Sequence, residues 1–354
     1  MVMPPFSVAR LPRIEFGAGS FRKVPALLGG FGNRVLLVTG SRSFRETSHW
    51  TWLTTELEVQ GFAWQEFAVS GEPSPQLVDR AVGDLRGLGI EVVLGIGGGS
   101  EQDAAKAIAG LLKPGNSVLD HLEGVGPELP YRGPATPFIA VPTTAGTGSE
   151  ATKNAVLGVH GKDGFKKSFR DERLVPEYAV VDPDLLAGCP RPLIAANGMD
   201  ALTQLLESYV STKANPFTDA LAMSGLEAAR DGFFAWHEGG PEAAAGRERM
   251  AYAAMLSGIT LAQVGLGSVH GLAAPLGAFF PIPHGVVCGT LVAAATEANI
   301  RAMQKREPAN PALARYAQVG RLRAGREMAG NEARATLVQR LSDWTRHLHL
   351  PPLG

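Results

Sequence analysis

The chain has 354 residues, 45% of them hydrophobic, a size that suits one large globular domain or two ordinary ones. Its 33 basic and 34 acidic side chains nearly cancel, so charge gives no reason to expect a nucleic acid or an anionic membrane as a partner. Only two cysteines are present, Cys189 and Cys288, which excludes a framework of several disulfides and fits a reducing compartment. We expect both to be small, partly buried apolar side chains.

The N-terminal residues and the apolar runs of the chain give no membrane signal. Residues 1–6 lack the basic region and apolar core of a secretory signal. No uncharged apolar run reaches the roughly 18 to 20 residues that cross a bilayer. We therefore expect a cytoplasmic protein.

The expected elements change character along the chain. Buried strands are expected at residues 34–40, 91–96, 138–141 and 179–181, and helical stretches such as 76–88 separate several of them. This alternation predicts an open, mostly parallel α/β domain at 1–188. From about residue 192 nearly every segment has helical periodicity, for example 220–229, 247–262 and 331–348, which predicts an all-helical domain at 189–354.

A glycine-rich turn follows the second expected strand. The run Gly97-Gly98-Gly99-Ser100 precedes a helix that is expected to begin near Glu101. Glycine lets the backbone approach a phosphate closely, and a helix N-terminus offers free N–H groups and a partial positive charge. Asp103 and Lys106 fall one turn apart on that helix. On spacing alone, a plain strand–helix turn with a solvated Asp–Lys pair explains the pattern equally well.

A second loop of small residues lies at 142–150. Its hydroxyl side chains, Thr143, Thr144 and Thr147, can bond phosphates, ribose or an adenine edge together with the backbone amides. The alternative is an ordinary turn.

Asp200, His270 and His284 are residue types that hold divalent cations. Asp200 and Gln204 are four positions apart on an expected helix, so both side chains lie on one face. Gln204 offers only a neutral carboxamide oxygen, which is a weak ligand.

Four segments, in this order along the chain, resemble the iron-containing (group III) alcohol dehydrogenase family, whose fold is shared with dehydroquinate synthase. They are 97–106, 142–150, 215–222 and 283–286, and the resemblance covers almost the whole chain. It implies a Rossmann-like domain that binds NAD(P), a helical domain for metal and substrate, and hydride transfer between NAD(P) and an alcohol, aldehyde or ketone. Members of this family often form dimers, so a homodimer is expected.

The resemblance also implies functional residues. It assigns the cofactor to the run Gly97-Gly98-Gly99-Ser100, Asp103, Thr143, Thr144 and Thr147. Lys167 matches a family lysine near the phosphates, with Lys166 as the competing choice. Asp200, His270 and His284 would line the catalytic site and hold Fe²⁺ or Zn²⁺ together with position 204.

The end of the first strand bears on the choice of cofactor. NAD-preferring members tend to have an Asp there that bonds the ribose 2′-OH, and this chain has Gly40. The missing carboxylate removes repulsion against a 2′-phosphate, and Ser41, Arg42 and Ser43 can donate to that phosphate. The sequence therefore predicts that NADP is accepted or even preferred.

Two positions depart from the family pattern. Gln204 stands where members carry His, and Ala274 stands where many carry a second His near the substrate. A carboxamide is a poorer ligand than imidazole, and Ala cannot relay protons. Both departures favour a metal-independent oxo-acid reductase similar to the maleylacetate reductases, whereas Asp200 and the segment 283–285 oppose it. A non-catalytic cofactor-binding homologue is a third hypothesis, which the intact phosphate loops oppose.

Overall fold

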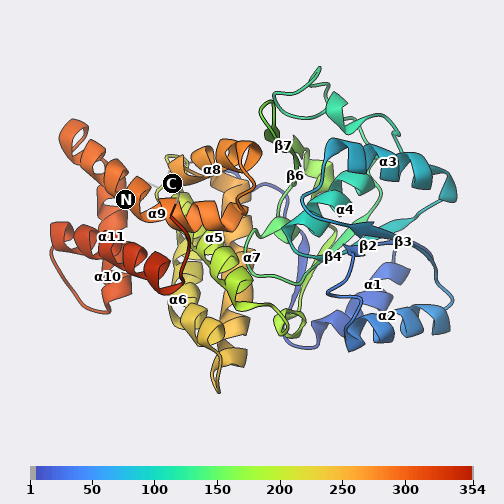
Figure 1. Ribbon diagram of the computed structural model, residues 1–354, viewed down its shortest axis with the longest axis horizontal. Coiled ribbons are helices and arrows are strands. Elements are labelled where there is room, and N and C mark those ends of the chain that lie inside the picture. The colour runs from blue at the N-terminus through green and yellow to red at the C-terminus, as the bar shows by residue number, and fades with distance from the viewer. Residues whose placement is uncertain (1–4, 353–354) are drawn as a thin grey trace. The chain divides into compact units, whose positions relative to one another are not determined.

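A computed structural model of the protein describes residues 5–352 (Figure 1). Of the N-terminal segment 1–6, which was judged not to be a secretory signal, residues 1–4 lie outside the described residues. The described chain forms two compact units. The first contains residues 9–144 and 148–188, and the second contains residues 5–8, 145–147 and the chain from Cys189 onward.

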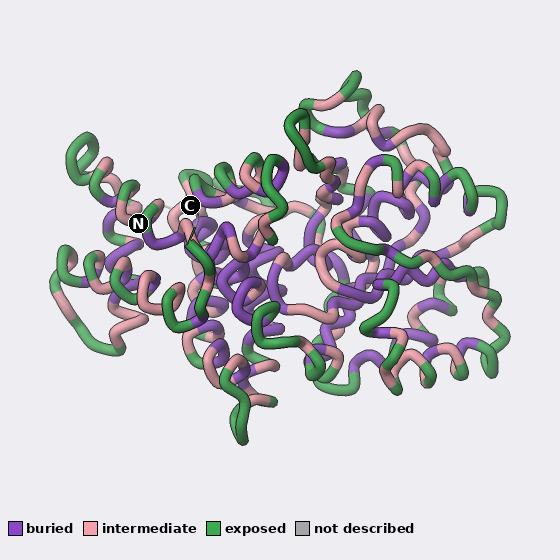
Figure 2. Tube along the Cα trace, viewed as in Figure 1, coloured by how far each residue is buried: buried purple, intermediate pink, exposed green. Residues whose placement is uncertain are grey.

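The first unit is built on a parallel sheet. Six described strands form this sheet in the order β1-β8-β5-β4-β2-β3, and each adjacent pair is parallel. The strands are β1 (Arg13–Phe16), β2 (Arg34–Gly40), β3 (Ala63–Val69), β4 (Val92–Gly97), β5 (Phe138–Pro142) and β8 (Tyr178–Val181). All of β4 and β5 is buried, as expected for central strands covered on both faces (Figure 2).

Helices cover both faces of this sheet (Figure 1). Leu36 and Val38 of β2 belong to a core with α3 (Pro75–Leu85) and α4 (Gly99–Leu111). Val35 and Leu37 belong to a second core with helices α1 and α2 on the other face. The bounds of those two helices are α1 (Val24–Gly29) and α2 (Ser48–Val59).

The strand order reverses between β2 and β4. Strand β3 lies on one side of β2, whereas β4 and then β5 lie on the other side. In open α/β sheets such a switch point opens a crevice at the carboxyl ends of the strands, where ligands bind. Gly40, Gly97 and Pro142 end β2, β4 and β5 at this edge. The first unit also holds an antiparallel hairpin of β6 (Asn154–Val159) and β7 (Phe165–Arg170).

The second unit is helical. Its helices are α5 (Arg191–Tyr209), α6 (Pro216–Glu238), α7 (Ala243–Val264), α8 (Ser268–Phe279), α9 (His284–Arg306), α10 (Pro311–Ala324) and α11 (Gly330–His347). Helix α5 packs against α6, α7 and α9, so it is buried on nearly all sides. Gly198 on α5 permits this packing, because a Cβ there would overlap the ring of Phe233 on α6.

The predicted fold class, an α/β N-terminal part followed by an all-helical C-terminal part, is confirmed. Among residues 5–352, no single helix combines the length and the apolar character needed to cross a bilayer. Only α7 and α8 taken together, with a bend of 101° between them, meet those criteria.

Candidate active site

The two glycine- and threonine-rich loops meet at the switch point of the sheet. The N–H of Thr143 donates to the carbonyl of Gly97 at 2.9 Å. A Cβ on Gly98 would lie 3.2 Å from Thr144 Oγ1, so glycine allows the close approach. The structure thus brings the turn at 97–100 together with Thr143 and Thr144. Thr147, the third predicted hydroxyl, belongs to the helical unit.

Helix α4 begins at Gly99, directly after the strand end, and its first turn carries a carboxylate. Glu101 Oε2 accepts the N–H of Gly98 at 2.8 Å, which is one half of a capping box. Burial of this side chain raises the pKa of Glu101. The helix start that the sequence analysis assigned to phosphate binding therefore includes a carboxylate.

Asp103 and Lys106 lie in an interior network further along α4. Lys106 Nζ is fully buried and donates to the Ser149 carbonyl, Ser149 Oγ, Thr152 Oγ1 and the Asn154 carbonyl at 2.7–3.0 Å. Ser149 Oγ donates to Asp103 at 2.5 Å. Burial lowers the pKa of Lys106 to about 8, although Asp103 acts in the opposite direction. These bonds anchor α4 to the segment 149–154, and contact between Asp103 and the cofactor stays a prediction.

Two of the remaining cofactor candidates, Ser41 and Lys167, lie at exposed positions. Ser41 is exposed in the turn after Gly40, which is itself buried. Lys167 is exposed on β7, whereas Lys166 donates to Glu72 at 2.7 Å. Lys166 thus already has a carboxylate partner, so Lys167 is the better candidate for an approaching phosphate.

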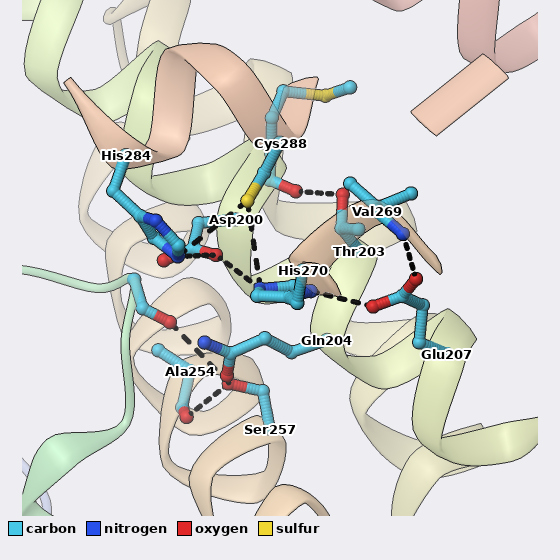
Figure 3. Close-up of polar contacts among 12 residues, drawn as sticks. Asp200, Thr203, Gln204, Glu207, Ala254, Ser257, Val269, His270, His284 and Cys288 are labelled. Carbon is cyan, nitrogen blue, oxygen red and sulfur yellow. Dashed lines mark hydrogen bonds and ion pairs between the residues drawn. The ribbon is translucent and has the colours of Figure 1, made fainter. Parts of the chain in front are cut away.

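The three predicted metal ligands come together in the helical unit with a donor that the sequence analysis missed (Figure 3). Asp200 lies on α5, His270 on α8, and His284 and Cys288 on the first two turns of α9. The four ligand atoms lie within 4.8 Å of one another. Cys288 is buried, and its thiol also lies beside the two imidazoles, a contact that the expectation of a small apolar side chain did not include.

Four of the six distances between these atoms are close to those of a tetrahedral metal site. Bonds of 2.0–2.3 Å place neighbouring ligand atoms about 3.3–3.8 Å apart in such a site. His270 Nε2 is 3.1 Å from Asp200 Oδ1 and 3.6 Å from Cys288 Sγ. His284 Nε2 is 3.8 Å from Asp200 Oδ1 and 3.7 Å from Cys288 Sγ. One carboxylate, two imidazoles and one thiol suit Zn²⁺ or Fe²⁺.

Glu207 orients one of the histidines. Its Oε2 lies 2.6 Å from His270 Nδ1, and its Oε1 accepts the N–H of Val269 at 2.7 Å. A proton on Nδ1 that points to a carboxylate leaves the lone pair of Nε2 directed at the cluster. Glu207 therefore fixes the tautomer that a metal ligand requires.

The pKa shifts of Asp200 and Cys288 determine which donors of the cluster are charged before a cation binds. Burial works against ionisation of Asp200, but His284 and His270 outweigh it and lower the pKa of this carboxyl. Burial, with the charge of Asp200, raises the pKa of the Cys288 thiol to about 11. A bound cation stabilises the thiolate, so binding would release this proton.

Gln204 lies beside the cluster, and the orientation of its amide decides whether it can join. Ser257 Oγ is 2.8 Å from Gln204 Oε1 and 2.8 Å from the Ala254 carbonyl, but a hydroxyl has one proton for the two acceptors. Exchanging the amide N and O satisfies all three groups, because Nε2 then donates to Ser257. The amide oxygen would then take the side of the two histidines, where Figure 3 shows the nitrogen. Its role as a ligand stays a prediction.

Family models cover both units. The model described as iron-containing alcohol dehydrogenase matches residues 12–183, and that of the C-terminal part of the Fe-containing family matches residues 194–352. The chain belongs to the iron-containing alcohol dehydrogenase family. The resemblance inferred from the sequence is thereby confirmed.

Individual members of the iron-containing alcohol dehydrogenase family are moderately similar to the chain. Alcohol dehydrogenase 4 of Saccharomyces cerevisiae is 39% identical over 232 residues, 65% of this chain and 59% of that protein. Lactaldehyde reductase of Escherichia coli is 36% identical over 245 residues, 68% of this chain and 62% of that protein. The chain thus spans less than two thirds of either relative. The crystal structure of an archaeal alcohol dehydrogenase from a Red Sea brine pool is 25% identical, with a TM-score of 0.87 over 99% of this chain and 88% of that one.

Two residues of the candidate site, Cys288 and Glu207, were not predicted from the sequence. Each lies at helical spacing from a predicted ligand, so its position in the sequence could have indicated it. Cys288 follows His284 by four positions, so one helical turn separates them. Glu207 follows Asp200 by seven positions, two turns along α5. A search for donors at helical spacing from the histidines would have found the cysteine.

Proposed function

We propose that the chain is an NAD(P)-dependent oxidoreductase that interconverts a small alcohol and its aldehyde or ketone at a metal centre held by Asp200, His270, His284 and Cys288. The observation that supports this function is the four-donor cluster within a chain of the alcohol dehydrogenase family. The two named relatives, an alcohol dehydrogenase and a lactaldehyde reductase, support the same substrate class.

Each protein ligand has a defined task in this proposal. A bound Zn²⁺ or Fe²⁺ would supply Lewis-acid polarisation of the substrate oxygen, which needs a coordination position beside the four protein donors. Asp200 and the Cys288 thiolate would offset the charge of a dication, while His270 and His284 would bind as neutral imidazoles. A thiolate favours Zn²⁺ over Fe²⁺, so we expect zinc at this site. Glu207 acts as a positioning residue through His270.

The sheet unit supplies the cofactor site. A nicotinamide dinucleotide carries the hydride in this chemistry. The turn at 97–100 offers the N–H groups of the α4 N-terminus to the diphosphate, and Thr143 and Thr144 add hydroxyl donors. Gly98 keeps the two loops in contact, which is the packing that such a cradle requires.

We further propose that exposed apolar residues of α8 and its C-terminal end line the substrate side of the helical unit. Leu272 and Phe279 lie on α8, the helix of His270, and Phe280 follows it directly. Their side chains are 49–52% exposed. Exposed apolar side chains near a metal ligand favour a substrate with a short hydrocarbon group.

A metal-independent oxo-acid reductase is the second candidate, and Gln204 and Ala274 favour it. Cys288 weakens that case, because it restores the number of strong donors that Gln204 reduces. We keep the metal-dependent reaction as the proposed function.

Metal content and turnover test the proposal together. Protein purified without chelators should contain near-stoichiometric Zn or Fe, lose aldehyde reduction on chelation, and regain it with added metal. Full activity without metal would favour the oxo-acid reductase. Failure to turn over any aldehyde, ketone or oxo-acid with either nicotinamide would favour the non-catalytic hypothesis.

We also propose that the protein is a homodimer, as the family resemblance implies, and that it is located in the cytoplasm. Light scattering on the purified protein should give twice the chain mass of 37.3 kDa, and a monomer mass would contradict the proposal.

A further inference from the structure

A carboxylate lies between the end of β2 and the glycine turn after β4. Glu101 Oε2 accepts the N–H of Gly98 at 2.8 Å. A Cβ built on Gly40 would lie 3.0 Å from the other oxygen, Oε1. Both contacts lie within the sheet unit, at the switch point where such sheets bind their ligands.

We propose that Glu101 supplies the carboxylate that β2 lacks at Gly40, and that it selects NAD(H) over NADP(H). This inference rests on the proposed function, because it requires a nicotinamide dinucleotide at this edge of the sheet. A carboxylate accepts hydrogen bonds from ribose hydroxyls and repels a phosphate on the 2′ position. An aspartate at position 40 would direct its carboxylate into the volume that Glu101 Oε1 occupies.

Helix capping alone does not account for this placement. The bond to Gly98 engages Oε2, and a glutamate at this position caps a helix whatever residue ends the neighbouring strand. Here the strand ends in a residue with no side chain, and Glu101 lies against it. The carboxylate therefore fits a position that a side chain from β2 would otherwise fill.

Charges around the β2–α2 turn support discrimination against a 2′-phosphate. Arg42 Nε donates to Glu46 at 2.9 Å, and Arg45 Nη1 donates to Glu66 at 2.5 Å. Each guanidinium thus already has a carboxylate partner, and Glu101 adds a third carboxylate to two cations. A phosphate would meet a surface that is negative on balance.

With Glu101 in this role, we expect the opposite preference from the one drawn from position 40 alone. The absence of Asp at the strand end predicted acceptance of NADP, because no other carboxylate was foreseen there. Glu101 is 61 positions away in the sequence, and β2 and β4 become neighbours only through the sheet order.

Nucleotide binding by the purified, metal-loaded protein tests this inference, with calorimetry giving Kd for NAD⁺ and NADP⁺. The wild type should bind NAD⁺ at least about tenfold more tightly, because like charges in contact disfavour the phosphate. Glu101→Gln keeps an oxygen for the Gly98 N–H but removes the charge, and should reduce this ratio about tenfold or more. Glu58→Gln, at an exposed position of α2 away from the β2–α2 turn, is the matched control and should change the ratio less than about twofold.

A swap of positions provides the stricter test. Gly40→Asp, added to Glu101→Ala, returns a carboxylate to the strand end and should restore the preference for NAD⁺. Glu101→Ala removes the side-chain atoms that a Cβ at position 40 would meet, and Gly40 lies outside the positive-φ region. An unchanged ratio in Glu101→Gln, or a wild type that prefers NADP⁺, would overturn the inference. If the wild type binds neither nucleotide, the proposed function fails and the inference fails with it.

Discussion

The nucleotide edge of the sheet and the metal cluster of the helical unit are built in different ways. At the sheet edge, the candidate groups follow strand ends within a few residues, so a short stretch of sequence defines the local geometry. The metal cluster draws its donors from α5, α8 and α9, over residues 200–288, and only helix packing brings them together. A site of the first kind is visible as a motif, whereas a site of the second kind is visible only as residue types.

Asp200→Asn should have the largest effect on the helical site. The buried carboxylate lies within 3.8 Å of both histidines, and the amide removes its charge from the donor set. Metal affinity should fall by more than about 100-fold, beyond the loss typical of outer partners. Competition with a chromophoric chelator measures this, and Asp343→Asn on the exposed face of α11 is the control. Unchanged affinity in Asp200→Asn would remove this residue from the ligand set.

Cys288→Ser tests whether helix packing has added the Cys288 thiol to the metal ligands, although no sequence motif predicts it. A hydroxyl does not ionise as a thiol does, so Zn²⁺ affinity should fall by about 10- to 100-fold. Cys189→Ser provides the matched control, since Cys189 is the other free cysteine and lies outside the cluster. Equal affinities of the two variants would mean that the thiol is no ligand.

Gln204→His in the Cys288→Ser background tests whether position 204 can supply the metal ligand that Cys288→Ser removes. If position 204 has the geometry of the family ligand, imidazole should recover at least about tenfold in metal affinity. Chelator competition on the single and double variants measures the recovery. No recovery would show that this part of the pocket has been rebuilt and that Cys288 cannot be exchanged for it.

Glu207→Gln should reduce metal affinity by about 10- to 100-fold, because the amide no longer fixes the Nδ1 proton of His270. The amide oxygen can still accept the N–H of Val269, so the melting temperature of the metal-free protein should hardly change. A loss of stability without a loss of affinity would assign Glu207 to the structure of α8 and leave the metal site independent of it.

In the core of the sheet unit, close packing should decide the effect of a substitution on stability. A Cβ at Gly95 would lie 2.7 Å from Ala105 Cβ and 2.9 Å from the Phe138 ring. Gly95→Ala should therefore cost about 1–3 kcal/mol in the free energy of unfolding. Gly83→Ala in α3 meets nothing within 4 Å and should instead stabilise by about 0.5–1 kcal/mol. Urea denaturation separates the two, and equal effects would contradict this account of the core.

The sequence predicted the buried strands of the fold and missed the exposed ones. Strands β2, β4, β5 and β8 were predicted because they are almost wholly buried and therefore apolar. Edge strands β1 and β3 were missed, since most of their residues are exposed or half-buried. The hairpin of β6 and β7 was also missed; β7 carries two consecutive lysines, and a polar strand gives no apolar pattern to detect.

The candidate site was predictable to the extent that its parts are local. The turn at 97–100 and the loop at Thr143 could be read from the sequence, because a strand end followed by glycine has few conformations. The partners of Glu101, Cys288 and Glu207 could not be read in this way, because sheet order and helix packing set them. Only the helical spacing of Cys288 from His284 and of Glu207 from Asp200 gave a signal. A family resemblance does not indicate such residues either, because it assigns roles only to the positions that match the family pattern.

X-ray absorption at the zinc edge of the Zn²⁺-loaded protein tests the central claim most directly, that Cys288 completes a metal site with Asp200, His270 and His284. The account predicts one sulfur at about 2.3 Å and three nitrogen or oxygen atoms at about 2.0–2.2 Å from the metal. Cys288→Ser should lose the sulfur and retain the lighter ligands. A wild-type spectrum with nitrogen and oxygen ligands alone would contradict the account.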